Sequence, residues 1–269
     1  MTPVLRKDWL RVIRLAEGEG FKPPSAEDFV LPPIFGDNAF TTKPIFLAFL
    51  AVILISSFFI LSARKAAVVP SKLQYAGESV YGFVRNNLAK DVIGHEFMRF
   101  VPYLFTLFTF ILVNNLFGII PFLQFPTMSR VSFPYVLAII TFLVFHYVGV
   151  RKHGAFKYIK DIMFMPGVPK VAYILITPLE LLTFFLVRPL TLSLRLFANM
   201  FAGHLLLMVF FLGGEHLLQG VIGLKLISPF AFLIGVALTF FEFMVQCLQA
   251  YIFTLLAALY IAGALADEH

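Results

Sequence analysis

Ionisable and amide side chains recur at helical spacing in two apolar stretches near the end of the sequence. The first stretch, PLTLSLRLFANMFAGH, covers 189–204 and carries three such side chains: Arg195, Asn199 and His204. The second carries three more, at positions i, i+4 and i+7: Glu242, Gln246 and Gln249. This spacing places the last two within about 40° of the first on a helical wheel.

These residue types are suited to moving protons. A carboxyl or imidazole can take up and release a proton, whereas a guanidinium keeps its charge at any accessible pH. Because the two stretches would be antiparallel, His204 and Glu242 can lie towards one end, with Glu180 towards the other. Titratable groups on both sides of the fixed charge of Arg195 are what two half-channels with a barrier would need.

Structural alternatives exist for each of these side chains. Glu242 could be a hydrogen-bonded core residue, and Gln246 and Gln249 could serve contacts between helices, which is the interpretation we prefer for Gln246. Arg195 could form a structural ion pair with Glu180 or Glu242. Chance alone is a poor explanation for the joint occurrence of all these groups in apolar sequence.

Composition indicates an integral membrane protein. The 269 residues are 60% hydrophobic and 13% charged, against about 25% charged residues in soluble domains. Several charge-free runs reach the roughly 20 residues that a helix needs to cross a bilayer. The formal net charge of +6 does not indicate a nucleic-acid partner, because the basic residues lie between the apolar runs.

The apolar runs predict an all-α fold with about five membrane-crossing helices. The expected helices cover 44–63, 100–124, 131–150, 171–212 and 226–266. They form one membrane domain, 44–269, which contains an amphipathic segment, 64–99, and follows a polar tail, 1–43.

The last two apolar runs are too long for upright spans. At 1.5 Å per residue each would be about 60 Å long, twice a hydrocarbon core of roughly 30 Å. Neither has a strong Pro-Gly break at its middle, so we expect a long, tilted antiparallel hairpin rather than two folded-back pairs. A short loop containing Gly213, Gly214, Glu215 and Lys225 joins the two helices in this prediction, and Pro178 and Pro189 are expected bends.

Basic residues predict the orientation. Segments 64–99 and 151–170 carry six and five basic residues, whereas 124–130 and the late loop carry one each. By the positive-inside rule the two basic segments are cytoplasmic. With five crossings, the N-terminus is then outside and the C-terminus is cytoplasmic.

Two short motifs resemble the signature of subunit a of F-type ATP synthases, of the bacterial type. They are LRLFANM at 194–200 followed by AGH at 202–204, and QAYIF at 249–253. The resemblance covers the last two helices specifically, and residues 44–150 agree with it in hydropathy and order.

The resemblance implies a proton-translocating stator subunit, whose long hairpin faces a ring of c subunits. Two half-channels would lead to the ring carboxylates, so that proton flow drives rotation and ATP synthesis. Arg195 matches the family's essential arginine, and Asn199 and Gln249 match polar residues beside it. His204 and Glu242 occupy the positions of an inlet Glu/His pair, in the order His then Glu. Glu180 resembles an acidic residue of the outlet channel.

The same resemblance implies the partners and the location. They are the c-subunit ring, the b-subunit stator stalk and the rest of the complex, in a bacterial plasma membrane. The isolated chain is not expected to be an enzyme or to bind nucleotide, because no GxxxxGK[ST] loop is present. No cofactor or metal is predicted. A self-contained secondary transporter is the alternative function, but it would show an internal repeat with broken helices. The choice between H⁺, which we favour, and Na⁺ stays open.

Overall fold

The computed structural model describes residues 23–25, 42–64, 67–120, 123, 125–163, 173–220 and 222–266. The predicted polar tail, 1–43, therefore lies outside the described residues except for 23–25 and 42–43. The main α-helices are α2 (Lys43–Ala63), α3 (Lys72–Phe83), α5 (Val101–Leu116), α6 (Ser132–His153), α7 (Ala155–Met163), α8 (Tyr173–Leu182), α9 (Arg188–Gln219) and α10 (Ile222–Leu265).

Four helical segments within the described residues are long and apolar enough to cross a membrane. They are Lys43–Ala63, Ser132–His153, Leu175–Gln219 and Ile222–Leu265. The shorter apolar helix α5 packs among them. These segments confirm the predicted all-α integral membrane fold.

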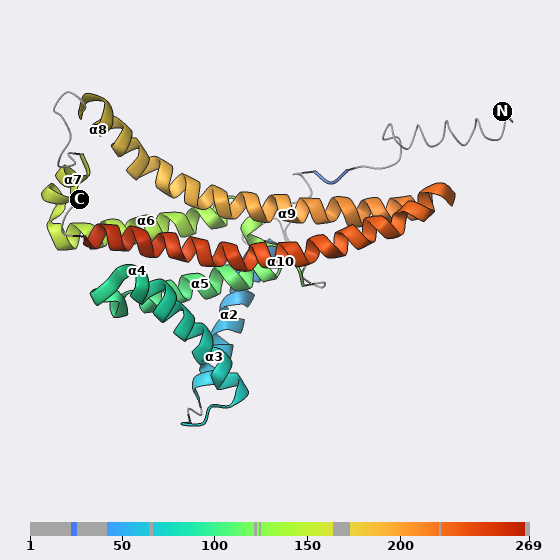
Figure 1. Cartoon of the computed structure of the whole chain (residues 1–269), viewed down its shortest axis with the longest axis horizontal. Coiled ribbons are helices and arrows are strands. Elements are labelled where there is room, and N and C mark those ends of the chain that lie inside the picture. Colours follow the sequence, from blue (N-terminus) through green and yellow to red (C-terminus); the bar gives the residue numbers. More distant parts are fainter. Residues whose placement is uncertain are drawn as a thin grey trace.

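The hairpin of α9 and α10 forms the long axis of the molecule, and α5 and α6 flank it (Figure 1). Its core contains large aliphatic and aromatic side chains of α9 and α10, among them Leu196, Met200 and Phe253. Buried Ala250 and Ala257 on α10 carry only a methyl group, which lets neighbouring helices approach closely. The site-bearing segments therefore contribute to the main hydrophobic core.

The turn of the hairpin differs from the predicted loop. Helix α9 continues through Gly213, Gly214 and Glu215 to Gln219, and α10 already begins at Ile222. A Cβ atom at Gly214 would lie 3.2 Å from the Phe232 ring, and the Ser228 hydroxyl donates to the Gly214 carbonyl at 2.7 Å. Gly214 thus allows close contact between α9 and α10, and the prediction of a loop at these glycines was wrong.

The start of α9 departs from regular α-helix. A π-helical segment, η6 (Thr183–Val187), joins α8 to α9. The Arg188 N–H donates to the Thr183 carbonyl five residues earlier. Pro189 has no N–H to give to the preceding turn, which accounts for the wider turn at this point. The expected bend at Pro189 takes the form of this π-helical turn.

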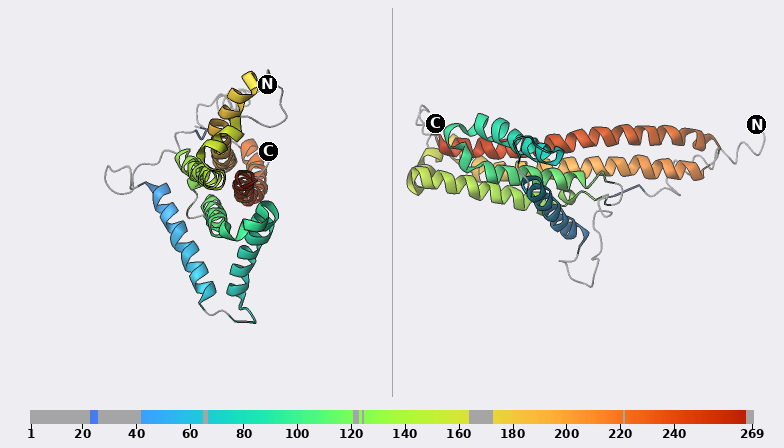
Figure 2. Two further views of the ribbon diagram at one scale, coloured as in Figure 1. Left: turned by 90° about the vertical axis from the view of Figure 1, so that its left-hand side faces the viewer. Right: turned by 90° about the horizontal axis from the view of Figure 1, so that it is seen from below.

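The amphipathic segment, predicted over 64–99, is helical from Lys72 to Arg99 in the structure. It comprises α3, the π-helical η3 (Val84–Lys90), α4 (Asp91–Ile93) and the 3-10 helix η4 (Gly94–Arg99). Gly94 has φ of 78°, a left-handed conformation that favours glycine. Helices α2 and α3 splay away from the bundle as a V in Figure 2, and their ends meet where Gly77 contacts Ser62.

Candidate functional site

Arg195 lies on the exposed side of α9. The neighbouring Ala198 and Asn199 are also exposed, whereas Leu196 and Met200 are fully buried on the opposite side. Within the described part of the chain, Arg195 makes no hydrogen bond or ion pair. Neither Glu180 nor Glu242 is its partner, so the alternative of a structural ion pair is not realised in these residues.

Asn199 and Gln249 connect α9 to α10. The Asn199 amide nitrogen, Nδ2, donates to Gln249 Oε1 at 2.8 Å. Gln249 itself is only 2% exposed. An amide pair of this kind holds both helices in register next to Arg195 without adding a charge.

Glu242 heads a chain of buried polar groups on α10. It is 4% exposed, and its Oε1 accepts a hydrogen bond from Gln246 Nε2 at 3.1 Å. The backbone carbonyl of Gln246 in turn accepts from Asn115 Nδ2 of α5 at 3.3 Å. A carboxyl group is thus held in the helix bundle by amide side chains rather than by a cation.

The Glu242 carboxyl also reaches α9. A Cβ atom at Gly203 would lie 3.2 Å from Glu242 Cδ, so the absent side chain leaves the space that the carboxyl occupies. His204, the next residue, is 8% exposed. The predicted imidazole and carboxyl groups therefore lie at the same level of the α9–α10 hairpin, on the turn side of Arg195.

Glu180 lies on the other side of Arg195 and has a different cation as its partner. Arg188 Nη2 lies 3.9 Å from Glu180 Oε1. The Arg188 guanidinium also stacks over the Phe184 ring, 4.3 Å from its centroid, and over Tyr260 at 5.5 Å. At 1.5 Å per residue, Glu180 and Arg195 are about 22 Å apart along the helices, and Arg195 and His204 about 14 Å.

Known proteins resemble this chain over nearly its whole length. Residues 45–262 match the family described as "ATP synthase A chain". An ATP synthase subunit a from Nocardioides sp. is 50% identical over 270 residues, covering 96% of this chain and 98% of that protein. The chain belongs to the ATP synthase subunit a family. The same name is carried by relatives from Pseudarthrobacter chlorophenolicus, 46% identical over 93% of this chain and 95% of that protein, and from Rhodococcus erythropolis, 40% identical over 98% of both.

Membership of the ATP synthase subunit a family supports a general role in the proton-translocating membrane sector of a multi-subunit complex. The family and the apolar helices together indicate a multi-pass membrane protein. The polar residues described above are then the candidate groups for that role.

Three contacting residues lie outside the predicted site. Asn115 is fully buried, and its side chain donates a hydrogen bond to the backbone of α10. Gly203 and Arg188 are the other two, and only the glycine directly before His204 indicates space for a carboxyl on the facing helix. Which side chain reaches that space depends on the register of α9 against α10, which the sequence does not show.

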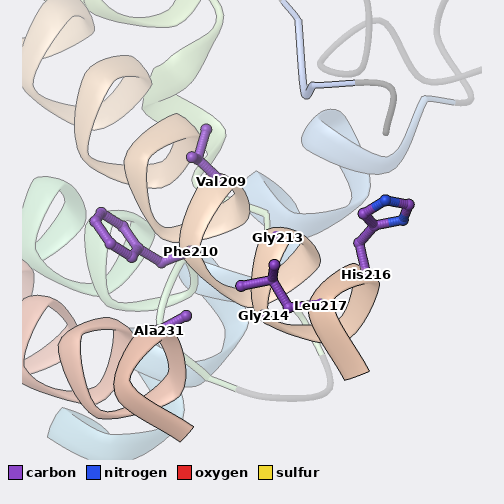
Figure 3. Close-up of a pocket in the computed structure, with 7 residues that line it drawn as sticks. All are labelled: Val209, Phe210, Gly213, Gly214, His216, Leu217 and Ala231. Carbon is purple, nitrogen blue, oxygen red and sulfur yellow. The ribbon is translucent and has the colours of Figure 1, made fainter. Parts of the chain in front are cut away.

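A surface cavity lies away from these residues, near the turn of the hairpin (Figure 3). It has a volume of about 330 Å³, and its lining includes Gly213, Gly214 and His216 of α9 with Ala231 of α10. Its lining contains none of the predicted site residues. The cavity therefore lies outside the candidate site.

Proposed function

We propose that this chain provides two half-channels to the carboxylates of a rotating c ring, so that proton flow drives rotation and ATP synthesis. The observation that carries this proposal is Arg195, a cation on the exposed side of an apolar helix without an ion-pair partner among the described residues. A charge at the centre of a membrane helix costs at least about 2.5 to 3.5 kcal/mol. A carboxylate on a neighbouring subunit would offset that cost.

The surface around Arg195 suits a helix of another subunit. Ala198 and Ala202 are exposed beside it, and small side chains let two membrane helices approach closely. A ring carboxylate next to the guanidinium would be stabilised in its ionised form. Once the carboxylate is protonated, that attraction is lost and the ring helix is free to move past Arg195.

His204 and Glu242 would form the inlet half-channel, with Asn199 and Gln249 holding α9 and α10 together beside Arg195. Glu180 would belong to the outlet half-channel. Protons would pass between water and the ring through His204, Glu242 and Glu180, because each of these three side chains can bind and release a proton. The permanently charged Arg195 lies between the two sets and would prevent a direct leak.

The orientation and partners complete the proposal. The basic segments 64–99 and 151–170 would face the cytoplasm of a bacterial cell, with the N-terminal tail outside and the C-terminus inside. The single membrane domain, 44–269, would contact the b-subunit stalk as well as the c ring. The complex, and not this chain alone, would carry out catalysis.

The test is ATP-driven acidification of vesicles that contain the whole complex with Arg195→Ala. We expect pumping to be lost while the complex stays assembled, and we expect a passive proton leak if Arg195 is also the barrier. Assembly is checked by co-purification of the c subunits and the soluble ATPase. Normal pumping by the assembled variant would show that Arg195 is structural and would overturn the proposal.

A further inference from the structure

Helix α7 has a surface that the proton path does not use. The helix lies at the end of the bundle that also holds the C-terminus, across the direction of α6 (Figure 1). Its residues read AFKYIKDIM from Ala155 to Met163. Phe156 is 87% exposed and Ile159 is 46% exposed, although both are large apolar side chains close to the charged residues Lys157 and Lys160.

The position of α7 follows from the end of α6. Helix α6 is a candidate span whose last turn is Arg151, Lys152 and His153. Gly154, with φ of 81°, ends it and turns the chain into α7. A short helix that starts directly after the charged end of a span lies at the boundary between hydrocarbon and water.

The rotation of α7 about its own axis is fixed at both ends. Tyr158 is 6% exposed and its ring fills the space beside Gly149 of α6, where a Cβ atom would lie 2.2 Å from the ring. At the other end, the Thr177 hydroxyl of α8 donates to the Met163 carbonyl at 2.9 Å. The helix can therefore not roll to bury its exposed side chains against the protein.

The face opposite Tyr158 combines apolar and basic side chains. With about 100° per residue, Phe156 and Lys160 each lie about 160° from Tyr158. Ile159 continues this face on one edge and Lys157 on the other. We define these four residues as the α7 outer face. Its apolar side chains suit acyl chains, and its two ammonium groups suit negative charge at the level of the headgroups.

We propose that the α7 outer face binds anionic phospholipid headgroups at the membrane surface. Charge complementarity favours this occupant, because Lys157 and Lys160 are exposed and form no ion pair within the described residues. Arg151 adds a further exposed cation next to α7 and hydrogen bonds the Tyr147 hydroxyl at 3.1 Å. Basic clusters directly beside a membrane span attract anionic lipid. The proposal does not depend on the half-channels.

The experiment places the photoreactive residue p-benzoylphenylalanine at Phe156 in the whole complex. The complex is reconstituted in vesicles of phosphatidylcholine with about 30% phosphatidylglycerol, a mixture in which the anionic lipid creates the negative surface. After illumination, mass spectrometry identifies what is joined to residue 156. We expect the ratio of phosphatidylglycerol to phosphatidylcholine adducts to exceed the ratio of the two lipids by about threefold or more.

Two double variants test whether the positive charges of Lys157 and Lys160 cause the enrichment, and a control position tests whether the location of the photoreactive residue does. Lys157→Gln with Lys160→Gln should reduce the phosphatidylglycerol adducts to the lipid's mole fraction, whereas Lys157→Arg with Lys160→Arg should keep the enrichment. The matched control carries the photoreactive residue at Leu143, which is 59% exposed in the middle of α6, and should react with both lipids in proportion to their abundance. Co-purification of the complex checks that each variant assembles.

Three results would overturn the proposal. Adducts in proportion to the lipid mixture in the parent complex would mean that the face has no preference for anionic lipid. Enrichment that survives in the double glutamine variant would mean that the two lysines do not provide it. Adducts with another subunit of the complex would show that the occupant is a protein.

Discussion

The two arginines at the start of α9 have opposite environments although they lie seven residues apart on the same side of the helix. Arg188 is 31% exposed, lies 3.9 Å from Glu180, and stacks over the rings of Phe184 and Tyr260. Arg195 is exposed and has none of these contacts among the described residues. The chain itself provides a partner for the charge of Arg188, whereas its described residues provide none for the charge of Arg195.

We propose that this difference separates a structural charge from a functional one. Arg188 joins three elements, α8, η6 and α10, so its removal should loosen the protein without removing a partner site. Arg195 makes no hydrogen bond, ion pair or ring contact within the described chain, so we expect its removal to leave the fold unchanged and to affect only what binds there. Residue type and spacing do not distinguish the two arginines, whereas their surroundings do.

The sharpest test replaces each arginine by glutamine in the whole complex. For Arg195→Gln we expect ATP-driven acidification to fall at least about 100-fold, as for loss of a positioned charge at a reaction centre. For Arg188→Gln we expect at least about a fifth of the rate to remain, because the lost interactions are worth only about 1 kcal/mol. Initial rates in vesicles with equal amounts of assembled complex measure both.

An equal loss of pumping in the two variants would contradict the distinction between a structural Arg188 and a functional Arg195. The distinction would also fail if Arg195→Gln prevented assembly while Arg188→Gln did not, because Arg195 would then be the structural cation. Leu194→Gln, at an exposed neighbour of Arg195, controls for adding an amide to this face.

The second prediction concerns a carboxyl that is held without a cation. Glu242→Gln keeps an oxygen that accepts from Gln246 but removes the group that can carry a proton. We expect pumping to fall about tenfold or more, as for loss of a proton-transferring side chain, with assembly unchanged. Glu96→Gln, at an exposed position in η4, should keep the parental rate. An unchanged rate in Glu242→Gln would show that this carboxyl has only a packing role.

The sequence patterns predicted the fold well but predicted the contacts between side chains poorly. Run length and hydropathy were sufficient for the all-α membrane fold, because the bilayer sets the length of each span. The extension of α9 through Gly213 and Gly214 was missed because a glycine that ends a helix and a glycine that admits Phe232 look alike in sequence. The pairing of Arg188 with Glu180 was also missed, because it depends on a π-helical turn that shifts the register.

The third prediction tests the structural role of Arg188 directly. In the intact complex, Arg188→Gln should increase amide hydrogen exchange in α8 and η6 by about fivefold, which corresponds to about 1 kcal/mol of lost local stability. Arg195→Gln should leave exchange in the same segment unchanged. Tyr260→Leu, which removes one ring beneath the guanidinium, should give a smaller increase. Equal exchange in all three variants would show that the Arg188 contacts do not stabilise this turn.

The smallest expected effect concerns the amide pair beside Arg195. If Asn199 and Gln249 act through their 2.8 Å hydrogen bond, each single alanine variant should slow pumping by about threefold, and the double variant should be no slower than either one. This coupling corresponds to about 0.6 kcal/mol, the average for polar pairs between membrane helices. Rates that multiply in the double variant would instead mean that each amide acts separately on a group outside the pair. In that case Arg195 would be positioned by more than the register of α9 against α10. The contrast with Arg188, which has its partners within the chain, would then be smaller than the described contacts indicate.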